Sequence, residues 1–312
     1  MTDFVVAIVA TYRRPRELSR LLGSLREIKS GLGAVIVVDN AGQPEIQTLV
    51  ENEPGNACYF APGKNLGCGG GLHFGEEKAF ALFKNEWTHI WILDDDTVVP
   101  PDAIEILTRA MRTESAEAAC PMITNQRGHI GWFPGLLETK AFQAIRNLST
   151  PGEYMAQCGS RSVPFWWSTG VSLLVSRRAI LELGCHRSDY WVRGEDLEFT
   201  LRISAQFKAI FVPGITVQHI PPEDSSTQNS RKSEYLKYAA MLQNLWYTSL
   251  YLPHGRRLMR TIPGNYLRFL KAGSFSSLIK AIHAFWLGAV IGKPAGAERG
   301  DFFRRRNDAD NG

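Results

Sequence analysis

The sequence predicts an α/β fold in which a mixed, mostly parallel sheet is flanked by helices and followed by a C-terminal helical segment. In the first 125 residues, short apolar runs alternate with stretches whose apolar residues recur at helical spacing. The apolar runs are continuous, as expected for strands that are covered on both faces. With 44% hydrophobic and 21% charged residues, the 312-residue chain can bury one large core.

The elements of the first half follow in order. Residues 4–10, FVVAIVA, predict the first strand. After Pro15, apolar residues at helical spacing predict a helix with proline near its first position. Further strands are expected at residues 34–38, around 58–61 and at 89–93, and further helices at 70–84 and after Pro100-Pro101. Strands alternating with helices favour parallel pairing through right-handed crossovers.

The second half is less regular. Between residues 125 and 162 the periodicity is lost to Gly, Pro, Ser and Gln, which predicts a functional loop or flap. A strand at 171–175 and a helical turn from Arg177 are expected next. Residues 197–203 fit both a strand and a helix, and periodicity leaves the choice open. A strand over 209–219, broken at Pro213-Gly214, and an amphipathic helix over 234–252 complete the pattern.

The general features of the chain favour a cytoplasmic protein. No apolar run reaches the roughly 18 uncharged residues of a membrane-spanning helix. The N-terminus has no basic region and no small-residue cleavage site, so no secretory signal is predicted. The five cysteines form no C-x-x-C pair, which favours reduced thiols over disulfides or zinc.

The C-terminal region is basic. From residue 255 to the end, eleven Lys/Arg stand against four Asp/Glu, a net charge of +7, whereas the first 254 residues carry −3. Aromatic residues accompany these charges, at Tyr266, Phe269, Phe275, Phe285 and Trp286. A basic, aromatic amphipathic segment can lie among lipid headgroups, so we expect a peripheral contact with the cytoplasmic face of the membrane. The alternative is a helical cap that packs on the rest of the chain or forms an oligomer contact.

The strongest local signal is Asp94-Asp95-Asp96, directly after the predicted strand at 89–93. Adjacent carboxylates repel one another unless a cation neutralises them. In open α/β sheets, ligands bind at the carboxyl ends of the strands, where this cluster is expected to lie. Carboxylate oxygens suit Mg²⁺ or Mn²⁺. A solvated acidic turn that caps the next helix remains the alternative.

Three further signals are weaker taken singly. The glycine-rich residues 63–75 would let backbone amides approach an anion, or they are plain turns. The pair Glu195-Asp196 could supply a general base, or it caps a helix. His219, at a strand end, is either a metal ligand or a structural histidine.

The order of these motifs is more specific than any one of them. The chain contains VATYRRP, VVDNAG, GKNLGCGGG, ILDDDT, WWSTG, GEDLEF and a strand that ends in His219, in that order. Over residues 5–219 it resembles the nucleotide-sugar-dependent glycosyltransferases of family 2, which have the GT-A fold. The N-x-G-x-G-G form of the glycine segment, together with DDD, is most similar to galactofuranosyl and rhamnosyl transferases of bacterial polysaccharide assembly.

The resemblance implies a donor site and a metal site. Thr11, Arg13 and Asp39 would contact the nucleotide, and Asn65 and Gly67 the ribose or diphosphate. Asp94, Asp96 and His219 would bind Mn²⁺ or Mg²⁺, with Asp95 beside the donor sugar. Lys64 stands where an arginine often precedes the Asn in these enzymes, so a bidentate phosphate contact is not expected there.

The resemblance also implies the catalytic and acceptor residues. Asp196 would be the general base and Glu195 would steady the acceptor. Trp166, Trp167 and Trp191 would line the acceptor channel.

The predicted function is therefore an inverting, metal-dependent transfer of galactofuranose or rhamnose from a nucleotide diphosphate to a hydroxyl of a growing, lipid-linked polysaccharide. Residues 1–230 would form the catalytic domain, with a nucleotide part to about 125 and an acceptor part from about 126, and residues 231–312 a helical region.

A non-catalytic nucleotide-sugar or glycan-binding relative is the alternative. No recognised nucleic-acid module is present, so no nucleic-acid partner is expected. The glycine-rich signature of sugar nucleotidyltransferases is also missing at the N-terminus. The oligomeric state stays open.

Overall fold

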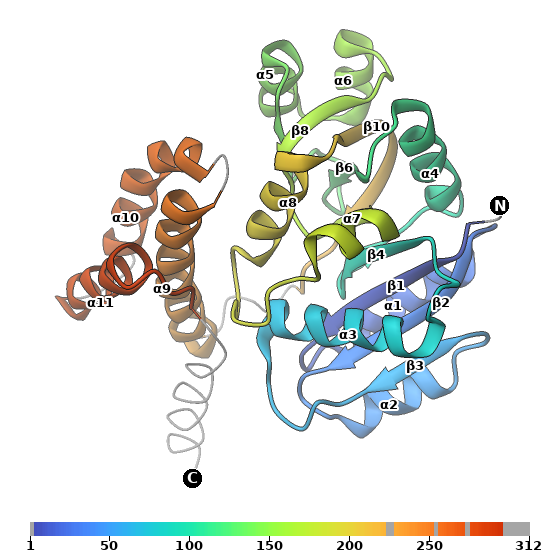
Figure 1. Cartoon of the computed structure of the whole chain (residues 1–312), viewed down its shortest axis with the longest axis horizontal. Coiled ribbons are helices and arrows are strands. Elements are labelled where there is room, and N and C mark those ends of the chain that lie inside the picture. Colours follow the sequence, from blue (N-terminus) through green and yellow to red (C-terminus); the bar gives the residue numbers. More distant parts are fainter. Residues whose placement is uncertain (1–2, 223–227, 253–254, 272–274, 296–312) are drawn as a thin grey trace.

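The structure is a computed structural model that describes residues 3–222, 228–252, 255–271 and 275–295. In these residues a ten-stranded sheet with the order β3-β2-β1-β4-β9-β6-β10-β8-β7, and with β5 paired to β10, lies between two layers of helices (Figure 1). The helices α9 to α11 gather on one side of this α/β body (Figure 1).

The first part of the chain forms β1 (Val5–Thr11), α1 (Pro15–Arg26), β2 (Leu32–Asp39), α2 (Pro44–Glu51), β3 (Ala57–Phe60), α3 (Gly67–Phe83), β4 (His89–Asp94), β5 (Thr97–Val98), α4 (Ala103–Glu114) and β6 (Ala118–Thr124). The central part forms β7 (Gly135–Leu136), α5 (Thr139–Asn147), α6 (Pro151–Cys158), β8 (Val163–Trp167), β9 (Ser172–Ser176), α7 (Arg177–Leu183), α8 (Glu195–Gln206) and β10 (Ala209–His219). The last part forms α9 (Gln228–Tyr251), the 3₁₀ helix η1 (Gly255–Thr261), α10 (Ile262–Lys271), α11 (Phe275–Phe285) and the π-helical turn η2 (Trp286–Val290).

The sheet is mixed and mostly parallel along its N-terminal half, as predicted. Strands β3, β2, β1 and β4 pair in parallel, and β10 pairs in parallel with β6. Strand β9 lies antiparallel between β4 and β6, so that β4, β6 and β10 share one direction. The carboxyl ends of β1, β2, β4 and β10 therefore lie at one edge of the sheet.

The core has two halves, one on each face of the sheet. Val6 and Ile8 of β1 face a cluster that includes residues of α3, α5, α7 and α8. Val5 and Val9 face the opposite cluster, with α1, α2 and α4. Because successive side chains of a strand point to opposite faces, a strand buried on both sides has to be apolar throughout. This confirms the reading of FVVAIVA as a central strand.

The predicted loop or flap between residues 125 and 162 is wrong. This segment contains β7, α5 and α6. The start of α6 is fixed by a reciprocal capping box, in which Glu153 N donates to Thr150 Oγ1 and Thr150 N donates to Glu153 Oε2. That Thr-x-x-Glu pattern is a readable helix start, but these helices are too short to show periodicity. The structure also resolves residues 197–203 as helix α8, and the break at Pro213-Gly214 as a bulge within β10.

The C-terminal helices pack on the body. Leu245 of α9 and Leu258 of η1 share an apolar cluster with Leu201 of α8. Helix α9 covers the predicted helix and begins earlier. Among the described residues no helix combines the length and apolarity that crossing a membrane requires. Arg299, Arg304, Arg305 and Arg306 lie outside the described residues, and the domain boundary near residue 230 stays a prediction.

Candidate active site

The candidate metal ligands are brought together by the strand ends. Asp94 is the last residue of β4, and Thr97 of β5 pairs antiparallel with His219, the last residue of β10. Ile220 N also donates to Asp96 O at 2.8 Å. The short pairing of β5 with β10 thus places His219 beside the three-aspartate turn, although His219 follows Asp96 by 123 residues in the sequence.

Asp94, Asp96 and His219 form a group with the geometry of a cation site. One ligand atom from each lies within 4.8 Å of the others. His219 Nε2 lies 3.0 Å from Asp96 Oδ1. Adjacent ligands of an octahedral ion bound at about 2.1 Å are about 3 Å apart, so this spacing fits a small divalent cation. The two carboxylates suit Mn²⁺ or Mg²⁺, and the imidazole, a ligand typical of transition metals, favours Mn²⁺ of the two.

The electrostatics of the turn favour a cation. Burial, followed by the charge of Asp96, raises the pKa of Asp94 to about 7. Burial also raises the pKa of Asp95, although Arg14 opposes the effect. For Asp96, burial is outweighed by the contacts with His219 and Arg14, which lower its pKa. The three carboxyls therefore do not all ionise easily until a further positive charge joins them.

Arg14 is one residue of the candidate site that the sequence interpretation did not single out. Its Nη1 lies 2.9 Å from Asp95 Oδ1 and 3.0 Å from Asp96 Oδ2. Thr11, a predicted donor-site residue, donates its hydroxyl to Asp95 Oδ2 at 2.6 Å. Arg13, predicted in the same role, has a left-handed backbone with φ of 58° and places its guanidinium over the Tyr12 ring. Two consecutive arginines give no sequence signal that distinguishes them.

The carboxylate pair shares a cavity with Asp94 and His219, two of the three candidate metal ligands. A cavity of about 150 Å³ is lined by Cys68, Leu72, Asp94, Trp132, Thr169, Gly170, Val171, Glu195, Asp196 and His219. Residues of two motifs that were predicted separately therefore line the same cavity, at the carboxyl edge of the sheet.

Asp196 and Glu195 begin α8 and differ in their surroundings. Asp196 accepts hydrogen bonds from Leu197 N at 2.7 Å and from Gly170 N at 3.3 Å. Burial raises the pKa of Asp196 in spite of these bonds. Burial, followed by the charge of Asp196, raises the pKa of Glu195 to about 8. The two backbone hydrogen bonds thus stabilise the ionised form of Asp196 more than that of Glu195. Its raised pKa makes Asp196 a stronger base than an ordinary aspartate.

The predicted donor residues form the loops around this edge. Asp39 is buried and accepts from Ala41 N at 2.9 Å and from Tyr59 Oη at 3.1 Å. Asn65 Oδ1 accepts from Gly67 N at 2.8 Å. Asn40, which the sequence interpretation did not single out, donates Nδ2 to Gly67 O at 3.0 Å and accepts from Leu66 N at 3.0 Å. Asn40 therefore ties the glycine-rich loop to the end of β2, while Lys64 is exposed.

The predicted acceptor tryptophans lie outside the cavity lining. Trp166 and Trp167 pack on the cluster formed by α8, α9 and η1, and Trp191 lies against Gly67. Trp132 lines the cavity instead, is 53% exposed, and donates Nε1 to His219 Nδ1 at 3.2 Å. Its only sequence signal was an isolated aromatic in a segment without periodicity. The acceptor role of the three predicted tryptophans remains a prediction.

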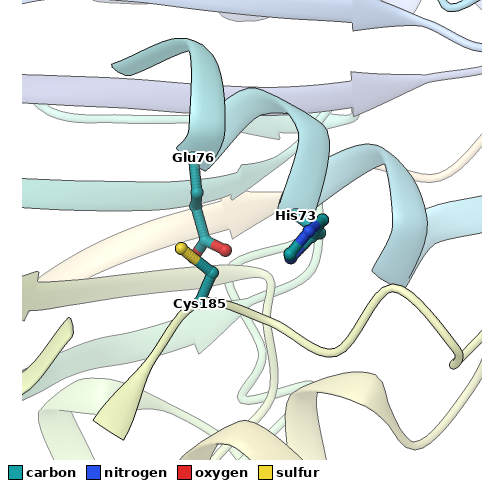
Figure 2. A group of neighbouring side chains, drawn as sticks. All are labelled: His73, Glu76 and Cys185. Carbon is teal, nitrogen blue, oxygen red and sulfur yellow. The ribbon is translucent and has the colours of Figure 1, made fainter. Parts of the chain in front are cut away.

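A second group of possible ligands, His73, Glu76 and Cys185, lies between α3 and the loop after α7 (Figure 2). His186 satisfies the Glu76 carboxylate, through N at 2.7 Å and Nδ1 at 2.8 Å, and its carbonyl lies 2.8 Å from His73 Nδ1. Burial, followed by the nearby Glu76, raises the pKa of the Cys185 thiol. These contacts attach the loop to α3. They explain why the three side chains lie close together, and no bound ion is needed for it.

The chain matches known families and folds. The family model of Glycosyl transferase family 2 matches residues 6–165, and that of Glycosyl transferase family group 2 matches residues 89–291. The galactofuranosyltransferase GlfT1 of Mycolicibacterium smegmatis is 33% identical over 126 residues, which are 40% of this chain and 40% of the relative.

Solved structures share the fold at low identity. TarS 1-349 of S. aureus in complex with UDP-GlcNAc has a TM-score of 0.59 and 12% identity, over 90% of this chain and 79% of that one. GalNAc-T7 with UDP, GalNAc and Mn²⁺ has a TM-score of 0.55 and 16% identity, over 78% of this chain and 51% of that one. The GT-A fold predicted from the sequence is confirmed by these similarities. Because the family model covers half of the sequence, the chain belongs to glycosyl transferase family 2.

Proposed function

We propose that the protein is an inverting, metal-dependent glycosyltransferase that moves a sugar from a nucleotide diphosphate to a hydroxyl of a growing glycan. One observation carries the proposal. The ligand set of Asp94 and His219 and the carboxylate pair Glu195-Asp196 line the same cavity. A transferase of this kind needs a site for the leaving diphosphate beside a base for the attacking hydroxyl, and the shared cavity supports this assignment.

The chain's own residues would divide the work as follows. Asp196 takes the proton from the acceptor hydroxyl while that oxygen attacks the anomeric carbon opposite the leaving diphosphate, so the configuration inverts. Glu195 hydrogen-bonds the acceptor. Asp94, Asp96 and His219 hold the divalent ion, which, when bound, offsets charge on the leaving phosphate. Arg14, beside Asp95 and Asp96, supplies a further fixed positive charge.

Galactofuranose from uridine diphosphate is the favoured donor, with rhamnose from thymidine diphosphate second. The similarity to a galactofuranosyltransferase supports the sugar, and the solved structures that hold UDP or UDP-GlcNAc support the uridine nucleotide. A panel of nucleotide-sugars, assayed for diphosphate release with Mn²⁺ and with chelator, tests this order. Equal release with and without Mn²⁺ would contradict the metal dependence.

The Asp196→Asn variant tests the mechanism. Removing the general base is expected to lower kcat by about 10²- to 10⁴-fold. Donor binding, measured by calorimetry with UDP and Mn²⁺, is expected to stay near the wild-type value because Asp196 faces the acceptor. An active variant would exclude Asp196 as the base, whereas a joint loss of binding and turnover would mean a misfolded site.

The acceptor is proposed to be lipid-linked, and the C-terminal helices to contact an anionic membrane. Ile279 and Ile282 of α11 are each 60% exposed, and Trp286 follows on the same helical face. Arg256, Arg257 and Arg260 of η1, in the same C-terminal region of the chain, are exposed as well. Apolar anchors with basic neighbours suit a headgroup layer that carries negative charge.

A flotation assay with vesicles of neutral and anionic phospholipid tests the membrane contact. The wild type is expected to float with anionic vesicles, and the Ile282→Glu/Trp286→Glu variant to remain at the bottom. The matched Leu181→Glu variant, which changes an exposed apolar residue of α7, should float as the wild type does. Equal recovery of all three proteins with both vesicles would exclude a membrane role for this face.

A further inference from the structure

The loop of residues 190–194, which leads into α8, is held by backbone hydrogen bonds on two sides. Cys68 N, at the start of α3, donates to Trp191 O at 2.8 Å. Trp191 N donates to Ala295 O at 2.7 Å. The loop therefore lies between the glycine-rich helix and the segment that follows the C-terminal helices.

Asn244 of α9 holds this loop by further hydrogen bonds. Its Nδ2 donates to Val192 O at 3.2 Å and to Arg193 O at 2.7 Å, and its Oδ1 accepts from Ala295 N at 2.6 Å. The residue is completely buried. Both amide hydrogens and the amide oxygen are thus engaged, and every partner is a backbone group of the loop or of residue 295.

The loop needs such support because its backbone is strained. Arg193 has φ of 59° and Gly194 has φ of 104°. A left-handed conformation costs a residue with a side chain about 1–2 kcal/mol. Strain of this kind persists only where the surroundings impose it. Asn244 binds the carbonyls of residues 192 and 193, directly beside the strained positions, and its Cβ lies 3.1 Å from where a Cβ of residue 194 would be.

The same face of α9 makes further contacts with the segment that leads to the loop. Tyr190 Oη lies 3.1 Å from Thr248 Oγ1, and both residues are buried. Arg187 Nη1 donates to Tyr247 Oη at 2.6 Å. Residues 244, 247 and 248 are neighbours on one helix surface, so the support is a property of this face and not of a single side chain.

The loop conformation determines where the carboxylate pair lies. Gly194 O accepts the first hydrogen bond of α8, from Glu198 N at 2.9 Å. The dihedral angles at residues 193 and 194 therefore set the direction in which Glu195 and Asp196 leave the loop. We propose that Asn244 is a positioning residue for sugar transfer: it holds the loop before α8 so that the carboxylates of Glu195 and Asp196 face the cavity. The inference rests on the function proposed above.

The Asn244→Asp variant isolates the donated hydrogen bonds. It places a carboxylate oxygen against the two loop carbonyls and keeps the oxygen that accepts from Ala295 N. We expect kcat to fall by about 10- to 100-fold, since a misplacement of about 1 Å has effects of this size. Binding of UDP with Mn²⁺, measured by calorimetry, should change less than about twofold, because the hydrogen bonds of Asn244 go to residues 192, 193 and 295 and to none of the proposed donor residues. Hydrogen exchange of residues 190–196 should be faster than in the wild type.

The Gln243→Glu variant is the matched control. Gln243 is the preceding residue of α9, is also buried, and donates Nε2 to Lys293 O at 2.9 Å and to Pro294 O at 2.9 Å. The substitution makes the same chemical change against the carbonyls of residues 293 and 294. Its kcat should stay within about threefold of the wild type. Asn244→Ser, which removes the donated bonds without adding a charge, gives the same test if the aspartate variant does not fold.

Two results would overturn the inference. One is a folded Asn244 variant with wild-type kcat or with unchanged exchange at residues 190–196. The other is an equal loss of kcat in the Gln243→Glu control. A wild-type protein that transfers no sugar from any donor would instead contradict the proposed function. The exchange comparison would still decide whether Asn244 holds the loop.

Discussion

At the scale of single residues, the candidate active site brings together several buried carboxyl groups whose negative charges would repel one another. Burial raises the pKa values of Asp94, Asp95, Glu195 and Asp196. Each pKa unit corresponds to about 1.4 kcal/mol of preference for the protonated form. The site is therefore under electrostatic strain when no cation is bound, and this strain should be measurable as a pH-dependent loss of stability.

The Glu195→Gln variant measures how much of this pH-dependent loss of stability is due to the Glu195 carboxyl. The folded pKa of about 8 lies above the ordinary value of 4.5, so the folded state binds the proton more tightly than the unfolded chain does. Its contribution to stability is then fully present below pH 4.5 and is lost as the pH rises through 8. Relative to the wild type, the variant should gain at least about 1 kcal/mol between pH 5 and pH 8.

Urea unfolding in the presence of chelator measures this difference. The control is Glu105→Gln, which changes an exposed glutamate on α4 and should show a constant difference across the same range. A constant difference for Glu195→Gln as well would mean that its carboxyl is already hydrated in the folded protein.

At the scale of elements, the decisive contact is α3 against the sheet. A Cβ at Gly75 would lie 2.5 Å from Ile8 Cγ2 of β1, and one at Gly67, where φ is 76°, would lie 2.0 Å from Trp191 O. Glycine at these positions lets the helix approach both the sheet and the loop before α8. The glycines of this segment are thus packing residues as much as ligand-binding ones.

The Gly75→Ala variant tests this packing. The added methyl group must displace Ile8 or move the helix, and we expect a loss of about 1–3 kcal/mol in the free energy of unfolding. The matched Gly23→Ala variant of α1 has nothing within 4 Å of the new Cβ, so it should gain about 0.5–1 kcal/mol. Chemical denaturation of both variants gives the comparison, and a stabilised Gly75→Ala would exclude close packing.

Elements with a clear hydrophobic pattern could be predicted from the sequence, and several short elements without one could not. β1, β2 and β4 are apolar because both faces are covered, and α1 shows its buried stripe. Helices α5 and α6 have nine and eight residues, which is too short for a convincing period. The segment 197–203 satisfied both periods, and only packing of Phe199 and Ile203 in the core distinguishes them.

At the scale of the whole molecule, the site is a product of topology. The motif order predicted that Asp94, Asp96 and His219 belong together, and the shared direction of β4 and β10 brings them within reach. Arg14, Asn40, Trp132 and Asn244 could not be predicted, because each acts through a long-range contact that leaves no local pattern. Side chains that only support a site depend on the fold, which a motif does not specify.

Metal removal tests the assembled site. The proposed function requires Mn²⁺ and UDP to bind the folded state, so at about 100 times their dissociation constant they should add about 2.7 kcal/mol of stability and raise Tm. Asp96→Asn should weaken Mn²⁺ binding by at least about tenfold, the smallest effect typical of groups that support a metal site. Asp102→Asn, outside the cavity, is the control. A Tm increase that survives both Asp96→Asn and chelator would contradict a cation at this turn.

The hydrogen bonds from Asn244 and Ala295 to the loop before α8 also bear on how the chain is made. During synthesis the N-terminal strands leave the ribosome first, whereas the partners of this loop are among the last described residues. A nascent chain that stops before residue 244 would lack the hydrogen bonds that hold the loop before α8. Under the proposed function, a productive loop would then require that synthesis has passed residue 295.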